Sequence, residues 1–259
     1  LMDGTSAMSG MNGARVVVIG ASSGVGRSFA HQAIAAGAQV VATARRADRL
    51  DELVAEAGAG HALAADVSDP EDCQRIAEKS LAVLGTVDLV FYAAGHAPLQ
   101  HLAATTTDQW RAVLETNVIG VQRIIGAFVP HMAESGIVAV LSSEAAGRPR
   151  PGLGAYGTSK VALSESLRAW RLEHPETRFS CVALGATQPT EFGDGFTPEV
   201  LIPVLESWFR HGLMQRDYMH TTEVAQLLID VLGAALRVPG IGLEELVLRS
   251  PSPIVDDWA

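Results

Sequence analysis

The sequence predicts a single doubly wound α/β domain, in which about seven parallel strands form one sheet with helices on both faces. Short runs of Val, Ile, Leu and Ala recur along the 259 residues, each is followed by a stretch with helical periodicity, and no linker or repeat interrupts the series. Strands that are apolar throughout are buried on both faces, as in parallel sheets. Their strict alternation with helices gives the doubly wound architecture.

The expected strands and helices alternate from Arg15 onward. Gly37 stands where a helix C-cap is expected, and Asp69-Pro70 supplies an N-cap residue followed by proline at the first helical position. The strands are expected at residues 16–19, 39–43, 61–65, 87–93, 137–142, 178–184 and 244–248. The helices are expected from the glycine-rich turn after the first strand to residue 36, at 47–57, from 70, and at 107–134, 156–173 and 222–236.

Composition excludes several classes of protein. A hydrophobic fraction of 48% with a mean hydropathy of +0.21 excludes a disordered chain. We find no apolar stretch of the roughly 18 residues that a membrane span needs, so we expect a soluble protein. Two cysteines cannot build a disulfide framework or a four-cysteine zinc site, which favours a reducing, cytoplasmic location and no metal. The net charge of −10 disfavours nucleic acid and anionic membranes as partners.

The first 13 residues are set apart from the domain. They lack the basic start and apolar segment of a secretory signal, and they show no apolar periodicity. We interpret residues 1–13 as a cloning remnant or a disordered lead-in, and residues 14–259 as the folded domain.

A glycine-rich turn follows the first strand. Its residues are Gly20-Ala21-Ser22-Ser23-Gly24-Val25-Gly26, with the spacing G-x-x-x-G-x-G. Glycines let the chain turn sharply and let a pyrophosphate approach the N-terminus of the next helix, where free N–H groups favour an anion. A glycine cluster alone also fits a tight turn, but its place on the first strand of a βαβ unit favours a Rossmann-like nucleotide site. The expected contacts are Gly20, Ser22, Ser23, Gly24, Val25 and Gly26.

The end of the second strand indicates which dinucleotide binds. An NAD-selective site places an acid about 20 residues after the glycines, for the ribose 2′-hydroxyl. Here Thr43-Ala44-Arg45-Arg46 offers no acid and two guanidinium groups that can pair with a 2′-phosphate. NADP(H) is therefore favoured over NAD(H), although both arginines, and Arg46 especially, could instead begin a solvated helix. Asp66 could accept from the adenine amino group or cap the next helix, for which Asp69 is better placed.

A tyrosine and a lysine lie four residues apart on one helix. Tyr156 and Lys160 therefore face the same side, in the pattern YxxxK. A nearby lysine cation stabilises a phenolate and lowers the pKa of a tyrosine toward the useful range. YxxxK occurs by chance on many helices, so its meaning depends on the rest of the chain.

Taken together, the motifs resemble the short-chain dehydrogenase/reductase family, in its single-domain branch, over nearly the whole chain from Arg15 to about Leu248. They occur in the order typical of that family: Gly20-x-x-x-Gly24-x-Gly26, Asp66, Ala93-Ala94-Gly95, Asn117, Ser143 and Tyr156-x-x-x-Lys160.

The resemblance implies four catalytic roles. Tyr156 is the general acid or base, and Lys160 lowers its pKa and holds the nicotinamide ribose. Ser143 binds the substrate oxygen and is preferred over Ser142 for its spacing to Tyr156. Asn117 kinks the long helix and holds a water in a proton relay, or only satisfies backbone groups there. Further cofactor contacts are implied for Asp66, Val67, Ala93, Gly95, Tyr156, Lys160 and Thr187, with Thr190 as the alternative to Thr187.

Two motifs depart from the family pattern. Tyr92-Ala93-Ala94-Gly95 stands where Asn-Asn-Ala-Gly is usual, so the support of the central sheet there is in question. Leu184-Gly185 replaces the usual Pro-Gly. Residues 190–221 follow the sixth strand and carry Phe192, Phe196, Trp208, Phe209, Leu213, Met214 and Tyr218. We expect a substrate-side lid there, or a helical excursion that packs its own aromatic residues.

The predicted function is the NADP(H)-dependent interconversion of a carbonyl and a secondary alcohol on a small, partly apolar molecule. A catalytically idle redox sensor, and a dehydratase or epimerase on the same scaffold, are the alternatives. His96, Glu144, Arg148 and Arg150 lie near strand ends and could touch substrate, but solvated positions are expected for the two arginines. A homodimer or homotetramer is expected from the resemblance and from apolar residues on the helices beginning at Thr107 and Tyr156, namely Val113, Val121, Ile124, Ile125, Leu163, Leu167 and Trp170.

Overall fold

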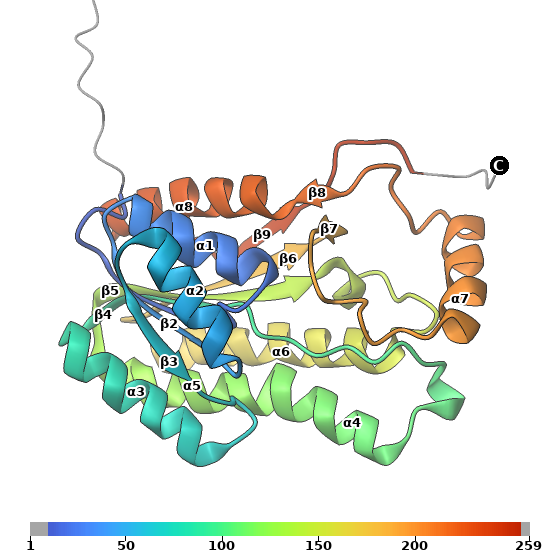
Figure 1. Ribbon diagram of the computed structural model, residues 1–259, viewed down its shortest axis with the longest axis horizontal. Coiled ribbons are helices and arrows are strands. Elements are labelled where there is room, and N and C mark those ends of the chain that lie inside the picture. The colour runs from blue at the N-terminus through green and yellow to red at the C-terminus, as the bar shows by residue number, and fades with distance from the viewer. Residues whose placement is uncertain (1–9, 255–259) are drawn as a thin grey trace, which may run out of the picture.

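A seven-stranded parallel sheet forms the centre of the computed structural model, which describes residues 10–254 (Figure 1). The strand order is β3-β2-β1-β4-β5-β6-β9. The chain adds strands toward one edge of the sheet up to β3 and toward the other edge from β4 onward, so the order switches between β1 and β4. In an open α/β sheet the carboxyl ends of the strands at such a reversal are where ligands bind. The strands are β1 (Arg15–Ile19), β2 (Gln39–Ala44), β3 (His61–Ala64), β4 (Val87–Tyr92), β5 (Met132–Ser143), β6 (Arg178–Leu184) and β9 (Glu245–Leu248).

Helices cover both faces of the sheet (Figure 1). One face carries α1 (Gly24–Ala35), α2 (Ala47–Ala57) and α8 (Thr221–Arg237); the other carries α3 (Pro70–Leu84), α4 (Thr107–Leu114), α5 (Gly120–Phe128) and α6 (Gly154–Glu173). Each face has its own apolar core. Phe29 of α1 stacks on Phe91 of β4 in the first core, and Ile76 of α3 packs with Ile124 of α5 in the second. The predicted fold class is confirmed.

The long helical pattern at 107–134 is the largest error in the predicted elements. A π-helix, Glu115–Ile119, joins α4 to α5, and a short 3-10 turn, Val129–His131, closes the segment. β5 then begins at Met132, so the helical prediction is wrong for the last residues of that range. Pro130 lacks a backbone N–H and restricts the residue before it, which ends an α-helix.

The segment Thr107–His131 also differs from the expectation that no stretch resembles a membrane span. By length and composition it could cross a membrane, with a mean hydropathy of 1.3, and 44% of that apolar window is buried inside the protein. Here α5 packs against α3 and β4, and α4 packs against α6. A helix that packs in the core of a globular domain is also long and apolar, so it passes the same test of length and hydropathy.

The domain begins earlier than the sequence suggested. Residues 1–9 of the expected lead-in lie outside the described residues, but Met11 has no exposed surface and belongs to the first core. Gly13 N donates to Gly37 O at 2.8 Å, which ties this segment to the end of α1. The exclusion of residues 10–13 from the fold is therefore wrong, because a single buried methionine leaves no periodic signal.

Residues 190–221 contain a helix, α7 (Pro198–Arg210), and contribute to a two-stranded sheet of β7 (Thr187–Gln188) and β8 (Met219–His220). Val204 and Trp208 of α7 are buried in a third apolar cluster, together with Leu153 and Tyr156. The helical-excursion alternative is thus present in the structure. Its aromatic residues pack against the predicted catalytic tyrosine rather than only against one another.

Candidate active site

One large cavity lies at the carboxyl ends of β1, β2, β4, β5 and β6. Its volume is about 1610 Å³. Pockets for a drug-sized ligand are about 300–1,000 Å³, so this space accommodates a dinucleotide together with a small substrate. The predicted site residues that line it are Gly20, Ser22, Ser23, Gly24, Val25, Gly26, Arg45, Arg46, Asp66, Val67, Ala93, Gly95, Ser143, Tyr156, Lys160 and Thr187.

The glycine turn is packed too tightly for side chains. A Cβ on Gly20 would lie 2.5 Å from Ala94 N, and one on Gly26 would lie 2.2 Å from the Gly20 carbonyl oxygen. Gly20 and Gly24 also have positive φ angles, +88° and +56°. At the start of α1, Ser23 makes no side-chain cap hydrogen bond, so the first N–H groups of the helix are not capped by it. These residues fit a dinucleotide pyrophosphate.

Two arginines border the expected adenosine end of the cavity. Arg45 is exposed and Arg46 is half-buried at the N-cap of α2. Arg46 Nη2 donates to Ser22 Oγ at 2.9 Å and to Glu191 Oε2 at 2.6 Å. The hydrogen bond from Arg46 is the main reason that the pKa of Glu191 is lowered. Arg46 does stand at the start of a helix with 41% of its side chain exposed, as the alternative expected, and it also joins the glycine turn to the segment after β7.

Asp66 lies at the end of β3 and lines the cavity. Its Oδ1 accepts hydrogen bonds from Ser68 N at 2.9 Å and Ser68 Oγ at 2.8 Å, which fixes the orientation of the carboxylate. The helix cap is Asp69, which accepts from Glu71 N. The sequence had favoured Asp69 over Asp66 as this cap, and the structure confirms that choice.

Asn117 sits in the π-helix and is fully buried. Its Nδ2 donates to the His96 carbonyl oxygen at 2.8 Å and to Ser159 Oγ at 2.9 Å, while its Oδ1 accepts from His96 N at 2.8 Å. One side chain thereby joins the loop after β4 to α6. The expected irregularity in the long helix is present at Asn117, and its place in a proton relay stays a prediction.

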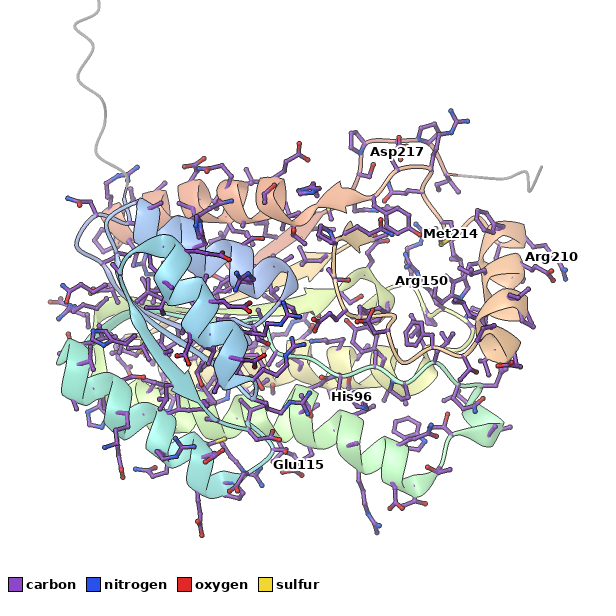
Figure 2. All side chains as sticks on the ribbon, viewed as in Figure 1. His96, Glu115, Arg150, Arg210, Met214 and Asp217 are labelled. Carbon is purple, nitrogen blue, oxygen red and sulfur yellow. The ribbon has the colours of Figure 1, made fainter. Side chains whose placement is uncertain are left out.

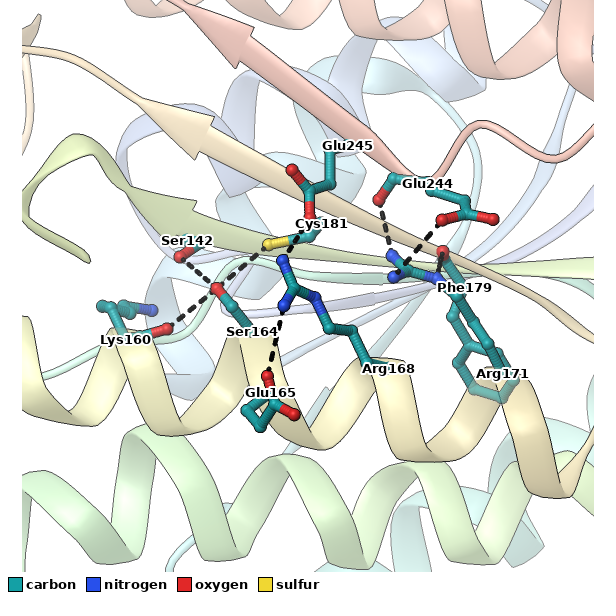
Figure 3. A network of polar contacts seen from close by, with 10 residues as sticks. All are labelled: Ser142, Lys160, Ser164, Glu165, Arg168, Arg171, Phe179, Cys181, Glu244 and Glu245. Carbon is teal, nitrogen blue, oxygen red and sulfur yellow. Dashed lines mark hydrogen bonds and ion pairs between the residues drawn. The ribbon is translucent and has the colours of Figure 1, made fainter. Parts of the chain in front are cut away.

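Ser143, Tyr156 and Lys160 meet at the carboxyl end of β5. Tyr156 shares a hydrogen bond with Ser143, and its ring centroid is 5.7 Å from Lys160 Nζ, which donates to the Leu141 carbonyl oxygen at 2.9 Å. The Ser142 hydroxyl oxygen lies 3.5 Å from that of Ser164 on α6 (Figure 3), and Ser142 lines the cavity as well. The choice of Ser143 over Ser142 stays a prediction.

The pKa values of Tyr156 and Lys160 are set mainly by burial. Burial raises the pKa of Tyr156 to about 12, and the hydrogen bond with Ser143 and the charge of Arg150 offset part of the rise. Burial lowers the pKa of Lys160 to about 8. Arg150 is thus one cation that favours the phenolate, and the same effect of Lys160, expected from the sequence, stays a prediction.

Tyr92 replaces the support that the missing asparagine amides would give. It is almost fully buried at the end of β4, and its hydroxyl donates to the Thr116 carbonyl oxygen at 3.0 Å. A Cβ on Gly120 would lie 2.7 Å from the Val67 carbonyl oxygen and 3.3 Å from that hydroxyl oxygen, so the close packing here leaves no room for a side chain. The phenol links the sheet to the π-helix. A lone tyrosine in an apolar strand was the signal available in the sequence.

The loops after β5 and β6 hold the remaining candidates. Thr187 Oγ1 donates to the Gly185 carbonyl oxygen at 3.0 Å, while the Thr190 side chain lies against Gly24; both threonines line the cavity. Arg148 is exposed, as expected. The solvated position expected for Arg150 is wrong: its side chain is only 14% exposed and lines the cavity, and Figure 2 shows it with Met214 between the sheet and α7.

Comparison with known proteins agrees with this geometry. Residues 14–199 match the family model for short chain dehydrogenases. An oxidoreductase of Listeria monocytogenes is 33% identical over 164 residues, which cover 61% of this chain but just under two thirds, 66%, of that relative. A short chain dehydrogenase from Burkholderia cenocepacia, solved in complex with NADP, superposes with a TM-score of 0.77 at 25% identity, covering 92% of this chain and 97% of the other.

A second solved structure is equally informative. An alcohol dehydrogenase from the archaeon Thermococcus sibiricus, complexed with 5-hydroxy-NADP, has a TM-score of 0.75 at 25% identity and covers 94% of this chain and 97% of the other. The family match, the sheet order and the cavity at its switch point lead to one conclusion. The chain belongs to the short-chain dehydrogenase family of oxidoreductases.

Proposed function

We propose that this protein is an NADP(H)-dependent oxidoreductase that interconverts a carbonyl and a secondary alcohol on a small, partly apolar molecule. The observation that carries the proposal is the continuity of one cavity. It extends from the glycine turn and Arg45 at one end to Ser143, Tyr156 and Lys160 at the other. A dinucleotide and a substrate can therefore lie in contact within it.

The cofactor is held by the residues at the switch point. The glycine turn offers backbone N–H groups for the pyrophosphate, and Arg45 with Arg46 offers cations for a 2′-phosphate. Six further residues line the cavity. In this proposal Asp66 and Val67 would contact the adenosine, and Ala93, Gly95, Lys160 and Thr187 would contact the ribose and nicotinamide. When bound, the cofactor donates or accepts a hydride.

The proton is handled by Tyr156. With a pKa of about 12, the phenol is protonated at neutral pH and can donate to a carbonyl oxygen during reduction. Ser143, which shares a hydrogen bond with Tyr156, is placed to bind the same substrate oxygen. Lys160 is held against the Leu141 carbonyl oxygen and faces Gly95, near the expected ribose.

Two other functions use the same scaffold. A redox sensor needs the glycine turn but not the reacting groups, whereas here Ser143, Tyr156 and Lys160 line one cavity and Asn117 donates a hydrogen bond to Ser159 beside Lys160. A dehydratase or epimerase would convert its substrate without net consumption of cofactor. The amount of NADPH consumed for each molecule of product distinguishes both from the proposed function.

The test is a screen of ketones and aldehydes with NADPH, followed by absorbance at 340 nm and product analysis. The proposal predicts one NADPH consumed for each alcohol formed. Product without loss of NADPH would support an isomerising enzyme, and no turnover with NADPH bound would support the sensor.

We also propose that the protein is a homodimer or homotetramer. The apolar residues of α4, α5 and α6 on which the sequence argument relied, such as Val121 and Leu163, are buried in the second core of the same chain. The exposed apolar residues of these helical segments are instead Ile119, Val161 and Leu172, the last with 85% of its surface exposed. Light scattering at micromolar concentration tests this; a monomer mass would contradict it.

A further inference from the structure

Arg150 is a buried cation in an apolar part of the cavity. Its guanidinium lies 5.7 Å from the centre of the Trp208 ring, on α7, and the neighbouring wall is formed by apolar residues. These are Leu153, Phe196, Leu201, Leu205 and Met214. Burial lowers the pKa of Arg150, which shows that its charge has lost much of its hydration.

The charges around Arg150 do not balance. Its Nη2 donates to Glu144 Oε2 at 3.1 Å, and the same oxygen is 3.5 Å from Arg249 Nε. Two guanidinium groups therefore share one carboxylate. Within residues 10–254, the only side-chain hydrogen bond of Arg150 goes to Glu144, and Arg150 Nε and Glu144 Oε1 are both buried without a partner. A buried donor without an acceptor is costly, so a second anion at this place would be stabilising.

The position of Arg150 relates this surplus charge to the reaction. Arg150 lines the cavity, whereas Glu144 lies behind it and does not, so the guanidinium stands between the carboxylate and the open space. Tyr156 belongs to the same apolar cluster as Trp208, whose ring lies against the Arg150 guanidinium. A group bound to Arg150 would thus belong to the molecule whose oxygen meets Tyr156.

We propose that Arg150 binds a carboxylate of the substrate, so that the substrates are oxo acids and hydroxy acids with an apolar body. The inference rests on the proposed function and adds the substrate class. The planar guanidinium offers paired N–H donors that match the two oxygens of a carboxylate, and Trp208 and its neighbours cover the apolar body. Reduction converts the oxo acid, NADPH and one proton into the hydroxy acid and NADP⁺.

The test measures binding, so it does not depend on turnover. Phenylacetate and the uncharged phenylacetamide are titrated into protein saturated with NADP⁺, which keeps them from the arginines of the nucleotide site. Tryptophan fluorescence reports occupancy, because Trp208 adjoins Arg150. The variants are Arg150→Gln, which removes the charge, Arg150→Lys, which keeps it, and Arg148→Gln, a control in the same loop whose side chain is exposed.

The parent and Arg148→Gln are expected to bind phenylacetate at least about 10-fold more tightly than phenylacetamide, or about 1.4 kcal/mol. Arg150→Gln should bind the two equally, and Arg150→Lys should recover part of the preference. Unchanged NADP⁺ affinity shows that a variant is folded. No preference in the parent, or a preference that persists in Arg150→Gln, overturns the proposal.

Turnover separates this inference from the proposed function. Benzoylformate and its methyl ester are compared as substrates with NADPH. If the ester is reduced and the acid has no advantage in kcat/KM, the substrate class is wrong and the oxidoreductase stands. If phenylacetate binds through Arg150 but no carbonyl compound is reduced, the proposed function fails and the anion site stands.

Discussion

The two ends of the cavity are built in different ways. At the cofactor end, β1, the glycine turn and α1 are consecutive in the sequence, and the backbone itself makes the site through positive φ angles and close approaches. At the substrate end, Arg150 comes from the loop after β5, and Trp208 and Met214 come from residues 190–221. A site made by consecutive backbone can be read from local sequence, whereas a site made by distant side chains cannot.

Gly26→Ala tests the backbone-built end and should have the largest effect. The added Cβ would lie 2.2 Å from the Gly20 carbonyl oxygen and 3.0 Å from Ala93 Cβ, so the turn must shift. We expect NADPH affinity to fall at least about 100-fold, measured by fluorescence titration, because overpacking of this kind displaces backbone.

The matched control for Gly26 is Gly126→Ala in α5. No atom lies within 4 Å of a Cβ at Gly126, so the same substitution should leave NADPH affinity unchanged. It should raise the free energy of unfolding by about 0.5–1 kcal/mol, because glycine is a poor residue within a helix. Equal NADPH affinities in the two variants would contradict a backbone-built site.

Lys160 lies between the glycine turn and the substrate end of the cavity. The pH dependence of the unfolding free energy tests whether its side chain is buried. Its pKa is lowered from 10.5 to about 8, so between these values the unfolded chain holds more protons and stability rises with pH. We subtract the unfolding free energy of Lys160→Met from that of the parent, both without cofactor. This difference should rise by an amount on the order of 3 kcal/mol over that window. Other groups cancel in the difference. A flat difference in urea unfolding from pH 7 to 11 would contradict a desolvated lysine.

Arg45→Ala sharpens the account of cofactor choice. In the parent we expect NADPH to bind roughly 10- to 100-fold more tightly than NADH, because of the charge-assisted contact with the 2′-phosphate. The variant should lose most of this preference, and salt should weaken it in the parent. Arg49→Ala is the control, since Arg49 pairs with Glu52 on α2 and does not line the cavity. Equal affinities in the parent would leave NADP(H) selectivity without support.

Glu191→Gln should have the smallest effect. The Glu191 carboxylate accepts hydrogen bonds from Arg46, so we expect it to compete with a cofactor phosphate for that arginine. Removing the charge should tighten NADPH binding roughly 2- to 5-fold, the range for a partly exposed ion pair. Glu199→Gln, an exposed residue of α7, serves as the control. Weaker NADPH binding in Glu191→Gln would mean that the carboxylate helps hold the cofactor.

The same contrast explains what the sequence could predict. All seven strands of the main sheet, the glycine turn and the Tyr156–Lys160 pair follow from local patterns. The hydroxyl bond of Tyr92, the ion pair of Arg46 with Glu191, and the burial of Arg150 each join residues far apart in the chain. Local periodicity carries no information on such pairs, so the sequence led us to expect a solvated position for Arg150.

The central claim is that cofactor binding and proton transfer are separable, with Tyr156 responsible for the second. The most direct measurement is kcat with the best carbonyl substrate, together with the Kd for NADPH, in the parent and in Tyr156→Phe. We expect kcat to fall at least about 100-fold, the scale for a positioned acid, while Kd changes by only a few-fold. Turnover near the parental value would contradict the account and remove Tyr156 as the proton donor.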